Sequence, residues 1–160
     1  MGTATDPYQH CEGRYRLTRG VVEALAHFAN PLSMLTKSTM IIRDLDVYRH
    51  LNEVAEVSVA MSVGTLYEEV RRVVEPGTPP GAKRLEILAR FSEAGIRTGV
   101  LVAPILPGLT DTEEHLDAVV ADLLLDALGQ SVHRAGSDLS GQRVGAFAQR
   151  DLFDFVSLDQ

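Results

Sequence analysis

The sequence predicts an α/β protein with a parallel sheet, and two observations lead to that prediction. Residues 57–63 and 98–106 are short, nearly continuous apolar runs, which is typical of strands buried on both faces of a parallel sheet. Longer segments with helical periodicity lie between such runs. Strands that alternate with helices are joined by right-handed crossovers, so the order favours half of a (β/α) barrel or a small open sheet.

The first half of the chain supplies a strand end, two further strands and two helices. The opening residues resemble the end of a strand and its loop, and residues 18–28 form the helix that follows. Residues 33–38 are the next predicted strand, and a helix over 44–54 leads from them to the strand at 57–63. Asp44 is the predicted N-cap of that second helix, because aspartate accepts hydrogen bonds from free amides there.

The second half contains two helices before the last strand. Thr65 and Glu68 have the spacing of a capping box, which predicts a helix from there to about Val74. Pro76 and Gly77 then break the chain. A helix over 82–94 follows, and Gly95 is its expected left-handed terminal residue, since glycine has no Cβ to clash in that conformation.

The last predicted helix is the most regular. Apolar residues recur at helical spacing over 116–128, and Asp111 with Glu114 is expected to cap its start. Residues 129–160 lose this periodicity, so they form either a divergent tail or a C-terminal cap. The domain organisation is therefore a core at 1–128 followed by a tail at 129–160 of uncertain structure.

Composition excludes several classes of function. The formal net charge of -7 and the absence of a Lys/Arg run argue against broad nucleic-acid binding, which depends on neutralising phosphates. One cysteine cannot form an internal disulfide, and we find neither a signal peptide nor an apolar run that spans a membrane. We therefore expect a cytoplasmic protein with no membrane partner.

Small polar residues follow the predicted strands, where α/β proteins bind their ligands. One ammonium, one carboxylate and several hydroxyls near a sheet edge suit a ligand that carries both an amine and a carboxylate. The polar residues in question are Thr3, Thr5, Asp6, Thr36, Lys37 and Ser62, and Pro104 stands at the corresponding end of the last strand.

Alternatives remain open at individual positions. Lys37 is a carboxylate-binding cation, a Schiff-base nucleophile or a solvated loop residue. Asp6 binds the ligand amine or starts the turn before Pro7. Cys11 has no partner cysteines at cluster spacing, and the five histidines show no metal-ligand spacing, so we interpret them as surface or boundary residues.

Several ordered motifs resemble the spore photoproduct lyase-like branch of the radical S-adenosylmethionine (radical SAM) enzymes. They are GTATDPYQ at residues 2–9, LTKS at 35–38, EPGTP at 75–79, and AGI at 94–96 with the strand that follows. The resemblance covers residues 1–128. It implies a partial (β/α) TIM-like barrel, truncated at the N-terminus, whose four parallel strands match the second to fifth strands of the usual six.

The resemblance also implies a cofactor and its contacts. Thr36 and Lys37 would contact the carboxylate of S-adenosylmethionine, and Thr5 would help hold its methionine moiety. Ser62, or Ala60 if the match slips, would approach the ribose or carboxylate. Main-chain groups around Ala103 and Pro104 would lie against the adenine.

The family holds a 4Fe-4S cluster on the three cysteines of a CxxxCxxC loop, which this sequence lacks. We therefore expect a fragment of a radical SAM enzyme that binds S-adenosylmethionine weakly and does not cleave it. The parent activity would be reductive cleavage followed by radical hydrogen abstraction from an unknown substrate. The alternatives are a non-catalytic interaction protein that associates through exposed barrel edges and an aldolase-type enzyme that uses Lys37.

Overall fold

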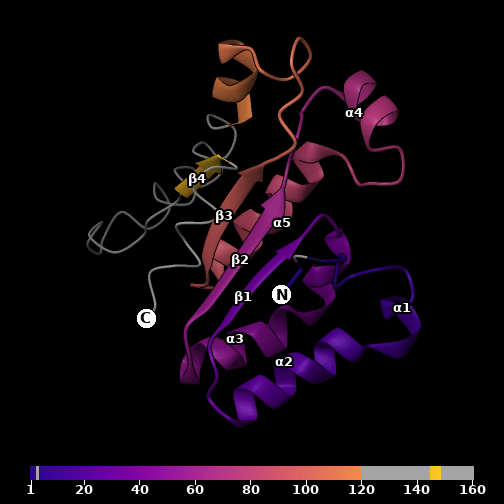
Figure 1. Ribbon diagram of the computed structural model, residues 1–160. Coiled ribbons are helices and arrows are strands. Elements are labelled where there is room, and N and C mark those ends of the chain that lie inside the picture. The colour runs from indigo at the N-terminus through magenta and orange to yellow at the C-terminus, as the bar shows by residue number, and fades with distance from the viewer. Residues whose placement is uncertain (3, 120–144, 149–160) are drawn as a thin grey trace.

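The computed structural model describes residues 1–2, 4–119 and 145–148 (Figure 1). Its sheet contains strands β1 (Leu32–Thr36), β2 (Val57–Ser62), β3 (Arg97–Val102) and β4 (Gly145–Ala148) in that spatial order. Each strand is parallel to its neighbour. The predicted parallel α/β fold is therefore confirmed, but the described strands form an open sheet and no barrel is seen among them.

Helices connect the strands as the periodicity predicted. They are α1 (Glu12–Tyr15), α2 (Leu17–His27), α3 (Leu45–Val54), α4 (Glu68–Val74) and α5 (Gly81–Glu93). A 3-10 helix, η1 (Thr39–Asp44), joins β1 to α3, and residues 113–119 are also helical. Most of the helix predicted at 116–128, and all of the predicted tail except β4, lies outside the described residues.

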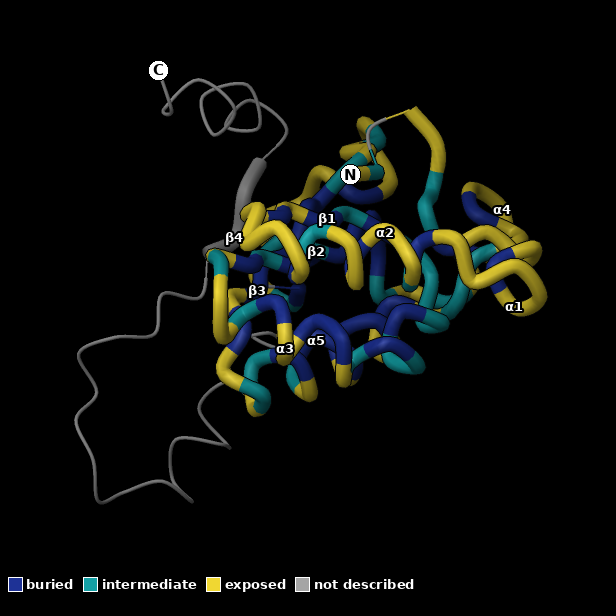
Figure 2. Tube along the Cα trace, turned by 90° about the horizontal axis from the view of Figure 1, so that it is seen from below, coloured by how far each residue is buried: buried dark blue, intermediate teal, exposed yellow. Residues whose placement is uncertain are grey.

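The core lies between the sheet and two of these helices. Helices α3 and α5 pack on one face, with α2 beside α3, and the buried positions gather between these layers (Figure 2). From the sheet this core takes Met34, Val59, Met61 and other alternate residues, all buried. The opposite face carries Ser33, which is exposed, and Ser58, which is half-buried. Strand alternation therefore assigns one face to the core.

The opening residues continue along β1. The Met1 amino group donates to the Ser33 carbonyl at 2.5 Å, and the Leu35 amide donates to the Met1 carbonyl at 2.9 Å. This exchange on either side of Met34 is the hydrogen-bond pattern of a parallel pair. Met1 thus occupies a strand position beside β1, in agreement with the predicted strand end, and the chain then turns away.

Three predicted helix caps are wrong, because Asp44, Glu68 and Asp111 each have a different partner. Asp44 stands at the N-cap position of α3 but makes no capping hydrogen bond. It pairs with arginine side chains instead. Helix α4 begins at Glu68, with Tyr67 as its N-cap. The Glu68 carboxylate bonds Arg71 in a bidentate pair, which is stronger than the return to a backbone amide that a capping box needs.

The third cap and one strand boundary also differ. Asp111 accepts from the Gly108 amide at 2.8 Å, and the hydroxyl of Thr112 accepts from the His115 amide at 3.2 Å. Thr112 therefore caps the helix at 113–119. Strand β3 ends at Val102, four residues before the predicted end, since Pro104 has no N–H to continue a ladder.

Gly95 was predicted correctly, since it follows Ala94, the C-cap residue of α5, with a φ of +80°. Across the described residues, every helix is too short or too polar to cross a membrane.

Candidate functional site

The carboxyl ends of β1, β2 and β3 meet at one edge of the sheet, because all three strands run in the same direction (Figure 1). Thr36 ends β1, Ser62 ends β2, and Ala103 directly follows β3. In open parallel sheets this edge is where ligands bind. The fold therefore brings together the strand-end residues that the sequence analysis selected separately.

At the end of β1, Asp6 ties the opening loop to the strand. Its Oδ1 accepts from the Thr36 hydroxyl at 2.6 Å and from the Tyr8 amide at 2.8 Å. Its Oδ2 accepts from the Lys37 amide at 2.8 Å. Both carboxylate oxygens are engaged within the protein, which favours the turn interpretation of Asp6 over amine binding. The Thr36 side chain is buried and supports the loop in the same way.

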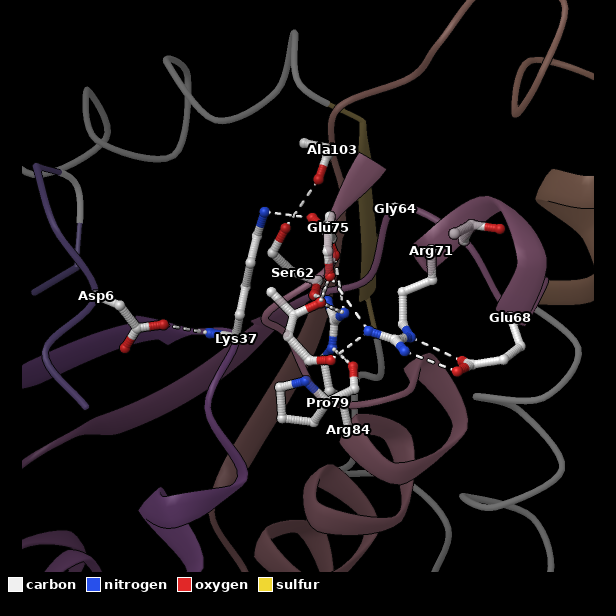
Figure 3. A network of polar contacts seen from close by, with 12 residues as sticks. Asp6, Lys37, Ser62, Gly64, Glu68, Arg71, Glu75, Pro79, Arg84 and Ala103 are labelled. Carbon is white, nitrogen blue, oxygen red and sulfur yellow. Dashed lines mark hydrogen bonds and ion pairs between the residues drawn. The ribbon is translucent and has the colours of Figure 1, made fainter. Parts of the chain in front are cut away.

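The Lys37 ammonium lies in a cluster with two residues that the sequence analysis did not assign to the site. Its Nζ is 2.5 Å from Glu75 Oε1, while Glu75 Oε2 accepts from Arg84 Nη2 at 2.8 Å (Figure 3). Burial acts to raise the pKa of Glu75, but hydrogen bonds from Lys37 and Arg84 outweigh it and leave that pKa lowered. The carboxylate is therefore ionised at neutral pH.

Two buried arginines organise the loop that carries Glu75. Arg71 donates to the carbonyls of Glu75 at 3.2 Å and Thr78 at 2.6 Å. Arg84 donates to the carbonyls of Pro79 at 2.9 Å and Ser62 at 2.5 Å. The EPGTP motif is thus the helix stop and turn that the sequence predicted, but it also delivers a carboxylate to the site.

The ends of β2 and β3 are joined by a side chain. The Ser62 hydroxyl donates to the Ala103 carbonyl at 2.9 Å, and Ser62 itself is buried. After β2 the chain passes close to the same segment, since a Cβ added at Gly64 would lie 3.5 Å from the Ala103 carbonyl oxygen. Ser62 rather than Ala60 therefore stands at the strand end.

The remaining predicted site residues are less informative. Thr5 and Pro104 are exposed near this edge, which leaves their roles as predictions. Thr3 lies outside the described residues.

One histidine departs from the surface or boundary position predicted for all five. His115 is 1% exposed, and its Nε2 lies 3.3 Å from the Gly64 carbonyl. Its ring packs against Tyr67, with centroids 4.9 Å apart. The helix at 113–119 covers the segment after β2, which buries His115. His10, His27 and His50 are exposed as predicted, and His133 lies outside the described residues.

The donor set fits one of the expected cofactors and not the other. A partly exposed lysine ammonium at the strand ends fits the carboxylate of an amino acid such as the methionine part of S-adenosylmethionine. A 4Fe-4S cluster held by three thiolates does not fit, because the sequence has one cysteine, and Cys11 is exposed. The described residues also contain no group of three or more His, Cys, Asp or Glu able to hold a metal.

Comparison with known families gives a match over most of the chain. The family described as the Radical SAM superfamily matches residues 11–119. That range includes β1, β2 and β3 with the helices between them.

Similar proteins occur in bacteria, archaea and a virus. An uncharacterized protein of Mycobacterium tuberculosis is 45% identical over 123 residues, which cover 77% of this chain and 36% of that protein. An uncharacterized protein of Acidianus two-tailed virus is 30% identical over 167 residues, covering 100% of this chain and 52% of its own. An uncharacterized protein of Methanocaldococcus jannaschii is 29% identical over 113 residues, which cover 71% of this chain and 42% of that protein.

The chain therefore spans between about a third and a half of the length of these relatives. No solved structure matches it.

Proposed function

The chain belongs to the radical SAM superfamily, and from this premise we propose that the carboxyl edge of its sheet binds S-adenosylmethionine. The observation that carries the proposal is the Lys37 ammonium at the end of β1, beside Ser62 and Ala103 at the ends of the next two strands. Bound there, S-adenosylmethionine would supply the adenosyl group from which this superfamily makes its organic radical. Radical chemistry is proposed for the whole protein of which such a domain forms part.

Lys37 binds the ligand carboxylate in this proposal. Its side chain is 36% exposed, so part of it is accessible from solvent while its ammonium contacts Glu75. Asp6 and Thr36 hold the Lys37 backbone in place. A charge-assisted hydrogen bond to a carboxylate is worth about 1.5–3 kcal/mol, which makes Lys37 the main anchor for the amino-acid end of the ligand.

The strand ends bind the nucleoside end. The Ser62 hydroxyl donates to the Ala103 carbonyl, and its oxygen keeps acceptor capacity for a ribose hydroxyl. Main-chain groups around Ala103 and Pro104 would lie against the adenine, while Thr5 would help hold the methionine moiety. We further propose that the chain belongs to the spore photoproduct lyase-like branch, which the EPGTP loop and the Thr36-Lys37 pair support.

The chain alone is proposed to bind without cleaving. The cluster that starts the chemistry in this superfamily needs three thiolates, and these 160 residues contain one. After anaerobic treatment with iron, sulfide and dithionite, we therefore expect no 5′-deoxyadenosine from S-adenosylmethionine. Formation of 5′-deoxyadenosine in amounts above a protein-free control would overturn this part of the proposal.

The binding proposal is tested by calorimetric titration of the 160-residue protein with S-adenosylmethionine. Lys37→Met is expected to raise the dissociation constant at least tenfold, because it removes the carboxylate partner. Lys83→Met is the matched control, since Lys83 also pairs with a glutamate at 2.5 Å but lies exposed on α5. Absence of binding by the wild-type chain, or equal affinities of the two variants, would contradict the proposed site.

An imine-forming role for Lys37 is less consistent with this geometry. An amine that attacks a carbonyl group must be uncharged, whereas the Lys37 ammonium lies 2.5 Å from the Glu75 carboxylate. Borohydride trapping with small carbonyl compounds is expected to leave the mass of the protein unchanged.

A further inference from the structure

The Glu75 carboxylate is divided between two cations that come from different parts of the fold. Oε1 contacts Lys37, which follows β1, and Oε2 contacts Arg84 of α5 (Figure 3). The Glu75 side chain is 8% exposed and the Arg84 side chain 1%. The contact to Lys37 therefore links a partly exposed lysine to a buried ion pair.

The buried pair is rigidly placed, because Arg84 has four polar partners. Besides Glu75 it donates to the carbonyls of Ser62 and Pro79, and to the hydroxyl of Thr78 at 2.9 Å. The guanidinium is planar and presents its donors in a fixed fork. The Glu75 carboxylate that it holds is consequently fixed relative to the end of β2, where Ser62 lies.

The charges of Lys37, Glu75 and Arg84 leave one positive charge for a ligand carboxylate. Arg84 and Glu75 carry opposite charges and neutralise each other in the protein interior. Lys37 therefore supplies the net positive charge of the three residues. An ammonium has three donors, and among the described residues the Lys37 Nζ has Glu75 as its hydrogen-bond partner. Donors remain for a second carboxylate while the first one holds the side chain.

We propose that Glu75 is a positioning residue, which together with Arg84 fixes the Lys37 ammonium for the carboxylate of the ligand. This inference rests on the proposed function. Asp6 already fixes the backbone of Lys37, and Glu75 fixes the other end of the side chain. A lysine side chain loses much rotamer freedom when it is immobilised. If the side chain is already ordered in the free protein, ligand binding does not have to offset this entropy cost.

The test uses two ligands that differ in the group Lys37 binds. S-adenosylmethionine has the amino-acid carboxylate, whereas 5′-methylthioadenosine shares the adenosine and lacks it. Glu75→Asp keeps the charge but is one methylene too short to contact both cations. We expect it to raise the dissociation constant of S-adenosylmethionine about tenfold and that of 5′-methylthioadenosine less than twofold. Glu75→Gln, which keeps the size of the side chain, is also expected to raise the dissociation constant of S-adenosylmethionine.

Two results would overturn the proposal. Unchanged or tighter binding of S-adenosylmethionine by both variants would show that Lys37 needs no positioning. Equal losses for the two ligands would show that Glu75 only supports the local structure. Glu86→Gln is the matched control, because Glu86 pairs with Lys83 on the surface of α5, and both affinities should stay within twofold. If the wild-type protein binds neither ligand, the proposed function fails instead.

A measurement on the wild-type protein decides the question even if neither variant folds. Lysine-selective ¹⁵N spectra of the ligand-free protein, assigned through Lys37→Met, should show a Lys37 ammonium with restricted motion. An ammonium that rotates as freely as that of the exposed Lys83 would refute the proposal.

Discussion

Among the described residues, the buried carboxylates of Asp44 and Glu75 each contact two cationic side chains, and they differ in the further contacts that those cations make. Asp44 is fully buried and pairs with Arg43 at 2.7 Å and Arg19 at 3.4 Å. Arg19 also forms a bidentate pair with Asp46, and Arg43 also donates to the Glu12 carbonyl. Glu75 pairs with Arg84, which is equally well occupied, and with Lys37, which is not.

The contrast shows that a buried carboxylate with cationic partners is not by itself a binding site. Around Asp44, a further donor comes from the Tyr8 hydroxyl at 3.2 Å. The members of this cluster therefore bond one another, and they hold the opening loop against η1. Around Glu75, Lys37 has donors at the edge of the sheet for which no other described residue is a partner. Unused donor capacity at a strand end distinguishes the candidate site from the structural cluster.

The largest effect is expected from Arg84→Met, which would break the buried half of the candidate site. It leaves Glu75 and two carbonyls without their buried donor, and loss of one partner of a buried ion pair costs about 3–5 kcal/mol. Urea unfolding measures the change. Arg72→Met is the control, because Arg72 is 72% exposed and should change the free energy of unfolding by less than about 0.5 kcal/mol. Similar losses in both variants would refute the structural role of Arg84.

Asp44→Asn should be less destabilising than Arg84→Met. It should also show that the Asp44 cluster contributes to stability and not to ligand binding. The amide cannot accept from Arg43 through both oxygens, but Arg43 is 26% exposed and water can replace part of the contact. We expect a loss of about 2 kcal/mol in the free energy of unfolding. The affinity for S-adenosylmethionine should stay within twofold of the wild-type value. A tenfold loss of affinity without further unfolding would show that the two clusters are coupled.

Tyr8→Phe tests how the Asp44 cluster holds the opening loop. The Tyr8 hydroxyl lies 3.2 Å from Asp44 and 3.3 Å from the Tyr48 hydroxyl, and burial raises the pKa of Tyr8. Removing this buried hydroxyl should cost about 1 kcal/mol, measured by thermal or urea unfolding. Tyr15→Phe should cost almost nothing, because Tyr15 is 59% exposed. Equal effects would show that the hydroxyl contributes no stability.

The smallest change in the free energy of unfolding is expected from mild acid, because mild acid protonates only a small fraction of the Asp44 and Glu75 carboxylates. Burial opposes ionisation of both carboxylates, but their cationic partners leave the pKa values of Asp44 and Glu75 below the usual 3.8 and 4.5. Stability from a lowered carboxyl pKa is present above the unfolded-state value and is lost as pH falls through the folded-state value. The free energy of unfolding should therefore be level above pH 5 and decline below pH 4, with a shallower decline in Asp44→Asn. An increase in stability on acidification would contradict both ion-pair assignments.

The chain itself determined most of the architecture. Apolar runs and helical periods predicted β1, β2, α2, α3 and α5 to within a few residues, since those patterns reflect which side of each element is buried. Gly95 was predicted from the sequence as well, because a helix often ends with a glycine in the left-handed conformation. Thr36, Lys37 and Ser62 could be placed at strand ends because parallel strands present their carboxyl ends at one edge.

Only the tertiary structure decided what the charged side chains contact. Asp44 and Glu68 had the spacing of helix caps, yet arginines displaced the backbone amides as their partners, since charge-assisted bidentate bonds are stronger. The same holds for Glu75. It pairs with Arg84, nine residues later, and with Lys37, which follows the distant strand β1. Hydrophobic periodicity is written locally in a sequence, whereas the choice among several possible ion-pair partners depends on which of them the fold brings within reach.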